Sequence, residues 1–127
     1  MGSVPEHRVP LAQPYFGKFA RTDEFNQVKR IKVLMFESLT PEEILQRDGR
    51  ETKYKPDDGL IRRLTFLDVA YKNGTEPRYL DVNSPRFQDD VAKSGIARND
   101  VVYVQRIKKG VGYQWAFSIE EKPTTHA

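Results

Sequence analysis

Residues 113–119 read Tyr-Gln-Trp-Ala-Phe-Ser-Ile, in which large side chains alternate with smaller or polar ones. Successive side chains of a β-strand point to opposite faces, so this segment places four large residues on one face. That face has to be buried against other elements, because an isolated strand is not stable in water. The segment therefore predicts a sheet around a hydrophobic core. We expect Trp115 to belong to that core rather than to a base-stacking surface.

Four more segments combine β-branched or aromatic residues with flanking turn residues, which is typical of strands. The Asn73-Gly74 dipeptide is a strong hairpin signal and predicts that the strands on either side of it are antiparallel neighbours. A Lys-Gly-Val-Gly connection separates the last two predicted strands. The predicted strands cover residues 27–39, 60–74, 77–84, 99–110 and 112–121.

Two short helices are predicted from their ends. Thr40 and Ser84 are good N-cap residues, and each is followed by a proline, which is favoured at the first helical position. Gly49 and Gly95 provide the matching C-terminal stops. The helices are expected over residues 40–49 and 84–95.

The predicted order is β-β-β-α-β-β, in an all-β chain with one or two short helices. This order matches the five-stranded Greek-key barrel called the OB fold, whose helix lies between its third and fourth strands. SH3-like barrels and small split sheets compete but lack a place for that helix. We expect an extended N-terminal arm over 1–27, the OB-fold domain over 28–121 and a disordered tail over 122–127.

Composition excludes several function classes. The chain has no cysteine, which removes disulfides and thiolate metal sites and favours the cytoplasm, or the host cytoplasm for a viral protein. No apolar run approaches the length of a membrane span. Both histidines, His7 and His126, lie in the expected tails, so the domain has no imidazole base.

Catalysis therefore has little support, and we expect no enzyme activity, no metal and no cofactor. A metal-dependent nuclease would pair a carboxylate with a lysine at close spacing, but Asp68 and Lys72 are four positions apart. The candidate carboxylates for such a site are Asp57, Asp58, Asp68 and Asp81.

Cations and aromatic residues suggest a different function. Residues 60–110 carry ten Lys and Arg against six Asp and Glu, in a chain of net charge +3. Alternation in the second strand sends Arg62 and Arg63 to opposite faces, so one face is expected to show cations. Single-stranded nucleic acid needs cations for its phosphates and aromatic faces for its bases. The alternative is a solvated face and an ordinary polar hairpin tip. The groove residues from this pattern are Arg62, Arg63, Tyr71, Lys72, Arg78, Tyr79, Arg106, Lys108, Lys109 and Tyr113.

A wider pattern joins a Ser-Pro helix start, the Gly-Ile-x-x-x-Asp-Val-Val entry at 95–102 and a Lys-Gly turn before an aromatic strand. With these features, about half of the chain resembles the small OB-fold single-stranded DNA-binding proteins of phages and mobile elements. The resemblance implies groove cations at Arg62, Arg63, Arg78, Arg106, Lys108 and Lys109, and stacking aromatics at Tyr71, Tyr79, Tyr103 and Tyr113. Many cellular members end in an acidic tail, whereas this chain ends Glu-Glu-Lys-Pro-Thr-Thr-His-Ala.

The sequence thus predicts a non-catalytic module that binds single-stranded DNA or RNA, with DNA as the first candidate, and with little sequence preference. Homo-oligomers are compatible with this function. The alternative is a protein-interaction or structural module of a phage or plasmid system. In that case the arm would bind a protein partner through Tyr15, Phe16 and Phe19.

Overall fold

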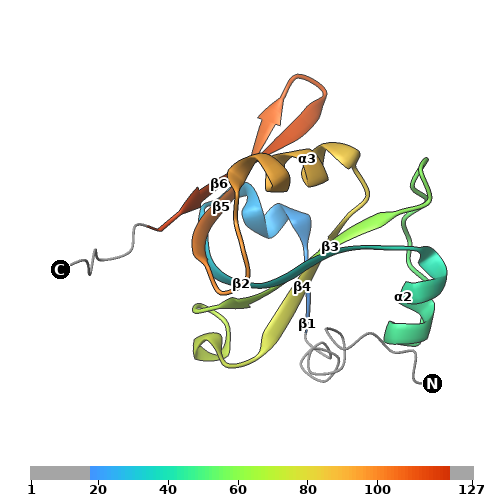
Figure 1. Cartoon of the computed structure of the whole chain (residues 1–127), viewed down its shortest axis with the longest axis horizontal. Helices are drawn as coiled ribbons and strands as arrows, with labels where there is room; N and C mark the ends of the chain where they lie inside the picture. The colour runs from blue at the N-terminus through green and yellow to red at the C-terminus, as the bar shows by residue number, and fades with distance from the viewer. Residues whose placement is uncertain (1–17, 121–127) are drawn as a thin grey trace.

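The computed structural model of the protein describes residues 18–120 and shows a mostly β fold with one mixed sheet and two α-helices (Figure 1). The predicted fold class, mostly β with short helices, is confirmed at this level. The strands are β1 (Lys18–Ala20), β2 (Lys29–Leu39), β3 (Ile61–Asp68), β4 (Pro77–Val82), β5 (Val101–Lys109) and β6 (Gly112–Ile119). The helices are α2 (Pro41–Asp48) and α3 (Pro85–Ser94), with 3-10 turns over Thr22–Asn26 and Lys72–Gly74.

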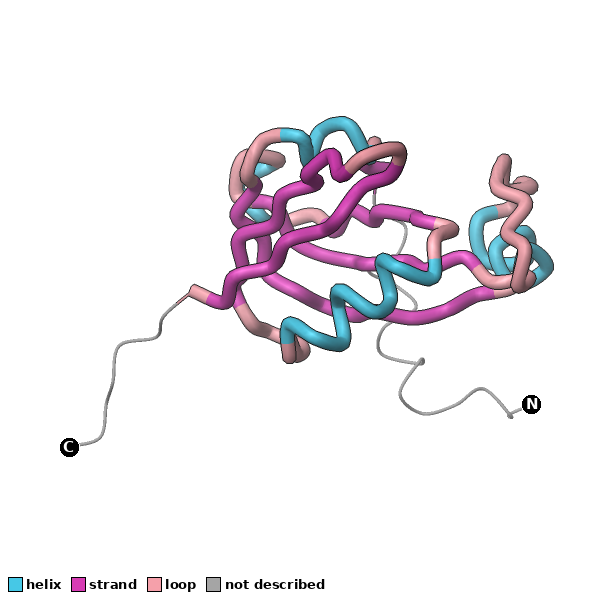
Figure 2. Tube along the Cα trace, turned by 90° about the horizontal axis from the view of Figure 1, so that it is seen from above, coloured by secondary structure: helices cyan, strands magenta, loops and turns pink. Residues whose placement is uncertain are grey.

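The sheet has the order β1-β4-β3-β2-β5-β6. Strand β2 joins its two halves, because residues 29–32 pair with β5 while most of the strand, through Leu39, pairs with β3. The register between β2 and β3 shifts between Val33 and Met35, at an irregularity that bends the strand. Figure 2 shows the resulting bent sheet, with α3 along one side and α2 beyond one end.

The sheet is open, so the closed barrel predicted from the strand order is not formed by the described residues. Closure would pair β6 with the free edge of β4, but that edge is occupied by β1, which pairs with β4 in parallel from Lys18–Arg78 to Ala20–Leu80. The turn at Thr22–Asn26 then packs against both β4 and β5. Residues 18–26 therefore fill the position that barrel closure would require.

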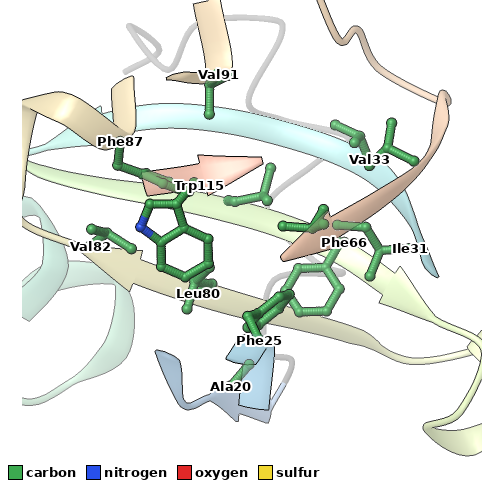
Figure 3. Close-up of a cluster of buried hydrophobic side chains, with 13 residues drawn as sticks. Ala20, Phe25, Ile31, Val33, Phe66, Leu80, Val82, Phe87, Val91 and Trp115 are labelled. Carbon is green, nitrogen blue, oxygen red and sulfur yellow. The ribbon is translucent and has the colours of Figure 1, made fainter. Parts of the chain in front are cut away.

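The core lies between the bent sheet, α3 and the Thr22–Asn26 turn (Figure 3). Trp115 is 5% exposed, and its ring lies 5.0 Å from that of Phe87 on α3 and 5.7 Å from that of Phe25. The expectation that Trp115 belongs to the core is confirmed. Its two aromatic neighbours come from separate parts of the chain, the Thr22–Asn26 turn and α3, so the indole links elements that surround the core.

The expected arm over residues 1–27 lies partly outside the described residues, and Tyr15 and Phe16 belong to the part that is not described. The expected tail over 122–127 lies wholly outside the described residues. The part that is described belongs to the fold. Ala20 and Phe25 are fully buried, whereas Phe19 is 46% exposed and packs edge-on against Tyr79 of β4. The segment from residue 18 to residue 26 thus contributes to both sheet and core.

Local signals at the helix ends operate as predicted. The Thr40 hydroxyl accepts a hydrogen bond from the backbone N–H of Glu43 at 3.1 Å, and the Glu43 carboxylate accepts one from the N–H of Thr40. Strands β3 and β4 are antiparallel neighbours, also as predicted. However, β3 already ends at Asp68, and Asn73 and Gly74 lie in a longer connection with positive φ angles.

Candidate nucleic-acid interface

Three arginines predicted for the groove are buried instead. Arg62, Arg63 and Arg78 are 3%, 1% and 8% exposed, so the expectation that one face of β3 shows cations to solvent is wrong. Each guanidinium is paired with carboxylates from other elements, and this pairing is what allows its burial. They are structural cations in this fold and cannot reach phosphates without breaking these pairs.

Arg63 has the most complete set of partners. Its guanidinium donates to Asp81 on β4 and to Asp48 on α2, each with a shortest distance of 2.7 Å. It also stacks on the ring of Tyr79, 4.0 Å from the ring centroid. Burial alone would lower the pKa of Arg63, but the two carboxylates raise it above its ordinary value. Arg63 therefore stays charged and joins α2 to the sheet.

Arg62 and Arg78 are held in the same way at other points of the sheet. Arg62 pairs with Asp58 and donates to the Gln88 side chain at 3.0 Å, which connects β3 to α3. Arg78 donates to Glu24 at 2.9 Å and stacks on Tyr71, with 4.8 Å from guanidinium carbon to ring centroid.

The carboxylates considered for a nuclease site are mostly used by these pairs. Asp58, Asp68 and Asp81 each accept hydrogen bonds from an arginine. Within residues 18–120, no group of three or more His, Cys, Asp or Glu could hold a metal ion, and Asp57 belongs to no such group.

The β5–β6 hairpin extends beyond α3 (Figure 1) and carries three of the four remaining predicted cations, Arg106, Lys108 and Lys109. Lys108 and Lys109 are exposed at its end, next to Gly110, whose φ of 60° closes the tight turn. Lys108 lies directly opposite Tyr113, which is 40% exposed. The predicted division of this segment, with Trp115 in the core and Tyr113 at the rim, is confirmed.

Arg106 stacks on Tyr113 at the base of the hairpin, with 3.9 Å between the guanidinium carbon and the ring centroid. Its hydrogen bonds go to neutral groups, the Asn26 amide oxygen at 2.9 Å and the Thr22 hydroxyl at 3.2 Å. Arg63 and Arg78 also stack on tyrosines, but their charges are offset by carboxylates. No salt bridge is found for Arg106 within the described part of the chain. The Arg106 guanidinium is thus held on the exposed ring of Tyr113 without a described carboxylate to offset its charge.

Other predicted residues lie elsewhere. Tyr103 is on the opposite face of β5 from Arg106 and Lys108, and its hydroxyl donates to Glu120 at 3.1 Å. Tyr71 and Lys72 are in or beside the β3–β4 connection, which Figure 1 shows at the far end of the molecule from the hairpin tip. The structure therefore brings together Arg106, Lys108, Lys109 and Tyr113, which we call the hairpin surface, and separates it from the others.

A pocket that was not predicted from the sequence lies between α2, the loop after α2 and the edge of the sheet formed by β1 and β4. We call it the α2 pocket; its volume is about 350 Å³. Tyr79, one of the predicted aromatics, forms part of its wall. The other lining residues come from distant segments, and only Tyr54 in an otherwise polar loop could have signalled it. The lining residues are Phe19, Ile44, Asp48, Arg50, Glu51, Thr52, Lys53, Tyr54, Tyr79 and Asp81.

Tyr54, which lines this pocket, has a raised pKa. Burial raises the pKa of Tyr54, the charge of Asp81 raises it further, and the charge of Arg106 acts in the opposite direction.

None of the helices in residues 18–120 has the length and apolar character needed to cross a membrane. Comparison of the chain with protein-family models, with curated proteins and with solved structures finds no match.

Proposed function

We propose that the protein binds single-stranded nucleic acid, DNA in the first instance, through the hairpin surface and without catalysis. We further propose that its fold is an open variant of the OB type. The strand order β4-β3-β2-β5-β6 and the position of α3 between β4 and β5 support this assignment. In OB folds the loop corresponding to the β5–β6 turn is one of those that contact a bound oligonucleotide.

The observation that carries this proposal is the Arg106–Tyr113 stack beside Lys108 and Lys109. A strand-binding surface needs mobile cations for phosphates and an exposed ring for bases, and these four residues provide both within one hairpin. Arg106 also fixes one side of the Tyr113 ring, which leaves the ring oriented before a base arrives. A preorganised ring loses less conformational entropy on binding.

Removing the two lysines is expected to weaken binding and its salt dependence together. The Lys108→Ala/Lys109→Ala variant should bind a fluorescent dT oligonucleotide about tenfold more weakly at low salt, because two phosphate contacts are lost. The slope of log affinity against log salt should fall in magnitude by about 1.4, at about 0.7 for each phosphate contact to a single strand. Fluorescence anisotropy at several salt concentrations measures both quantities.

The matched control is Lys93→Ala/Arg98→Ala, which removes the same charge from two exposed positions outside the hairpin. It should leave the salt slope almost unchanged. If both double variants weaken binding equally, the effect is one of net charge and not of the hairpin surface. Absence of binding at low salt by a folded protein would exclude the proposed function.

The stacking contact has its own test. Tyr113→Ala should reduce affinity by about 5- to 150-fold, which corresponds to about 1–3 kcal/mol for one stacked base, while Tyr113→Phe should retain most of it. The salt slope should be preserved in both variants, because no phosphate contact is removed. A slope that falls with Tyr113→Ala would indicate that the ring acts only by holding Arg106.

One observation favours a second function, the binding of another protein. Val111 at the hairpin tip is fully exposed, and Ile107 is 36% exposed on the same hairpin. Exposed apolar side chains that cluster often mark protein contacts. If the protein bound is a second copy of this chain, Val111→Asp should abolish self-association measured by sedimentation velocity, and Lys108→Ala/Lys109→Ala should leave it unchanged.

A further inference from the structure

The α2 pocket has walls, floor and rim of different chemistry. Its walls are aromatic, its floor is formed by the carboxylates that hold Arg63, and its rim carries exposed charged side chains of the loop after α2. A volume of about 350 Å³ is at the lower end of the range for small-ligand sites, about 300–1,000 Å³. The walls are Phe19, Tyr54 and Tyr79, the floor is Asp48 and Asp81, and the rim includes Arg50, Glu51 and Lys53.

The walls offer a prepared stacking surface. Tyr79 is fixed by the Arg63 guanidinium at 4.0 Å from its ring centroid and by a T-shaped contact with Phe19, with ring centroids 5.8 Å apart. Tyr54 is anchored by packing against Leu39, Ile44 and Ile61. These rings are held by their neighbours before any ligand arrives, and both tyrosines remain partly exposed. A planar group can therefore bind at low cost in side-chain entropy.

The floor offers hydrogen-bond acceptors. Each oxygen of Asp48 and Asp81 accepts one hydrogen bond from Arg63, at distances between 2.7 and 3.1 Å. An ionised carboxylate has about four lone-pair sites, so each of these groups keeps acceptor capacity. The negative charge reaches the walls: burial raises the pKa of Tyr79, and the charge of Asp48 raises it further. The floor thus favours a ligand with an edge that consists of hydrogen-bond donors.

The rim adds cations. Arg50 and Lys53 are exposed at the opening, and no salt bridge is found for either within residues 18–120. Glu51, also on the rim, offsets one of these charges. A simple cation would be attracted by the floor but repelled at the opening. A nucleotide suits both, since its phosphate can contact the rim while its base enters the pocket.

We propose that the α2 pocket binds a guanine base, stacked against Tyr79 and Tyr54, with its N–H edge directed at the carboxylates of Asp48 and Asp81. Guanine presents two adjacent donors, N1–H and the N2 amino group. The corresponding edges of adenine and cytosine place an acceptor beside their amino group, and thymine flanks its single N–H with two carbonyls. A floor that only accepts hydrogen bonds therefore favours guanine.

This inference rests on the proposed strand-binding function when the guanine belongs to a strand, but the same pocket could take a free guanine nucleotide. Three probes separate these cases: oligo-dT, oligo-dT with one central dG, and GMP. A single dG should tighten oligonucleotide binding by about tenfold, in line with the discrimination expected from one bidentate base contact. Substitution of that dG by deoxyinosine, which lacks the N2 amino group, should remove most of the gain.

Variants assign the preference to the pocket. Asp48→Asn should abolish the gain from dG while leaving the affinity for oligo-dT unchanged, and Asp89→Asn on α3 is the control for lost charge. Both proteins are checked by urea unfolding, because Asp48 also holds Arg63. The deoxyinosine comparison needs no variant and stays decisive if Asp48→Asn does not fold.

The outcomes are distinct. Equal affinity for oligo-dT with and without dG, together with no binding of GMP, overturns the guanine site and leaves strand binding intact. Binding of GMP by a protein that does not bind oligo-dT supports the pocket and overturns the proposed strand function. A gain from dG that survives both deoxyinosine and Asp48→Asn also overturns the guanine site.

Discussion

Replacing Arg63 by methionine is expected to lower the free energy of unfolding by about 3–5 kcal/mol, the range for breaking a buried ion pair by removal of one partner. Arg63 is 1% exposed and is the common partner of Asp81 and Asp48. Methionine fills much of the same space but leaves the carboxylate of Asp81 buried without its counter-ion. Urea unfolding followed by Trp115 fluorescence measures the loss.

The difference in the free energy of unfolding between the protein and Arg63→Met should also depend on pH. Burial raises the pKa of Asp81 above its ordinary value even though Arg63 lowers it. A carboxyl group with a raised pKa in the folded state favours folding in acid and opposes it as pH rises through that pKa. Removing Arg63 raises this pKa further, so the deficit of the variant should shrink from neutral pH toward about pH 4, near the ordinary pKa of aspartate.

Arg50→Met provides the control for this substitution, because Arg50 is exposed, and it should change stability by less than about 0.5 kcal/mol. A deficit for Arg63→Met that is the same at every pH would show that lost packing, and not the unpaired Asp81, accounts for it. A deficit below about 1 kcal/mol would contradict the structural role assigned to Arg63.

Phe25→Ala is expected to cost about 3–5 kcal/mol, as for other fully buried aromatic residues. Phe25 is completely buried and meets Phe66 and Trp115 with ring centroids 5.8 and 5.7 Å apart. It comes from a segment that the sequence indicated as part of an arm. The expected loss is therefore a direct measure of how far residues 18–26 belong to the domain.

Phe19→Ala is the matched comparison from the same segment. Phe19 is 46% exposed and has one aromatic partner, Tyr79, so a loss of about 0.5–1.5 kcal/mol is expected. Similar and small losses for both variants in thermal or urea unfolding would mean that the segment is only loosely attached to the sheet. A large loss confined to Phe25→Ala agrees with the observed packing.

The elements that depend on local signals could be predicted from the sequence. Strands β2 to β6 follow from alternation and turn residues, and both helices follow from their N-caps, such as Thr40 with its reciprocal bond to Glu43. Barrel closure could not be judged in this way. It depends on whether the three-residue strand β1 pairs with the edge of β4. The paired residues, such as Lys18 and Arg78, are sixty positions apart in the sequence, and no local pattern predicts such a pairing.

The same distinction between local and long-range features applies to the candidate site. The hairpin surface was predictable because Arg106, Lys108 and Tyr113 are close in sequence and their faces follow from strand alternation. Alternation gives the face of β3 on which Arg63 lies. It does not reveal that Asp48 on α2 and Asp81 on β4 neutralise the Arg63 guanidinium. The α2 pocket was not predicted for a similar reason, since three stretches of the sequence, around residue 19, over 44–54 and over 79–81, contribute to its lining.

The parallel pairing of β1 with β4 also sets an order of events during synthesis. A chain made from its N-terminus completes β1 long before β4 exists, because Lys18 pairs with Arg78. Until then the apolar ring of Phe25 has no finished core to enter. Pairings this far apart in sequence are associated with slow folding, on the scale of milliseconds to seconds. Pairing of β1 thus has to wait for β4, and full burial of Phe25 has to wait for Trp115 on β6, the last strand to be made.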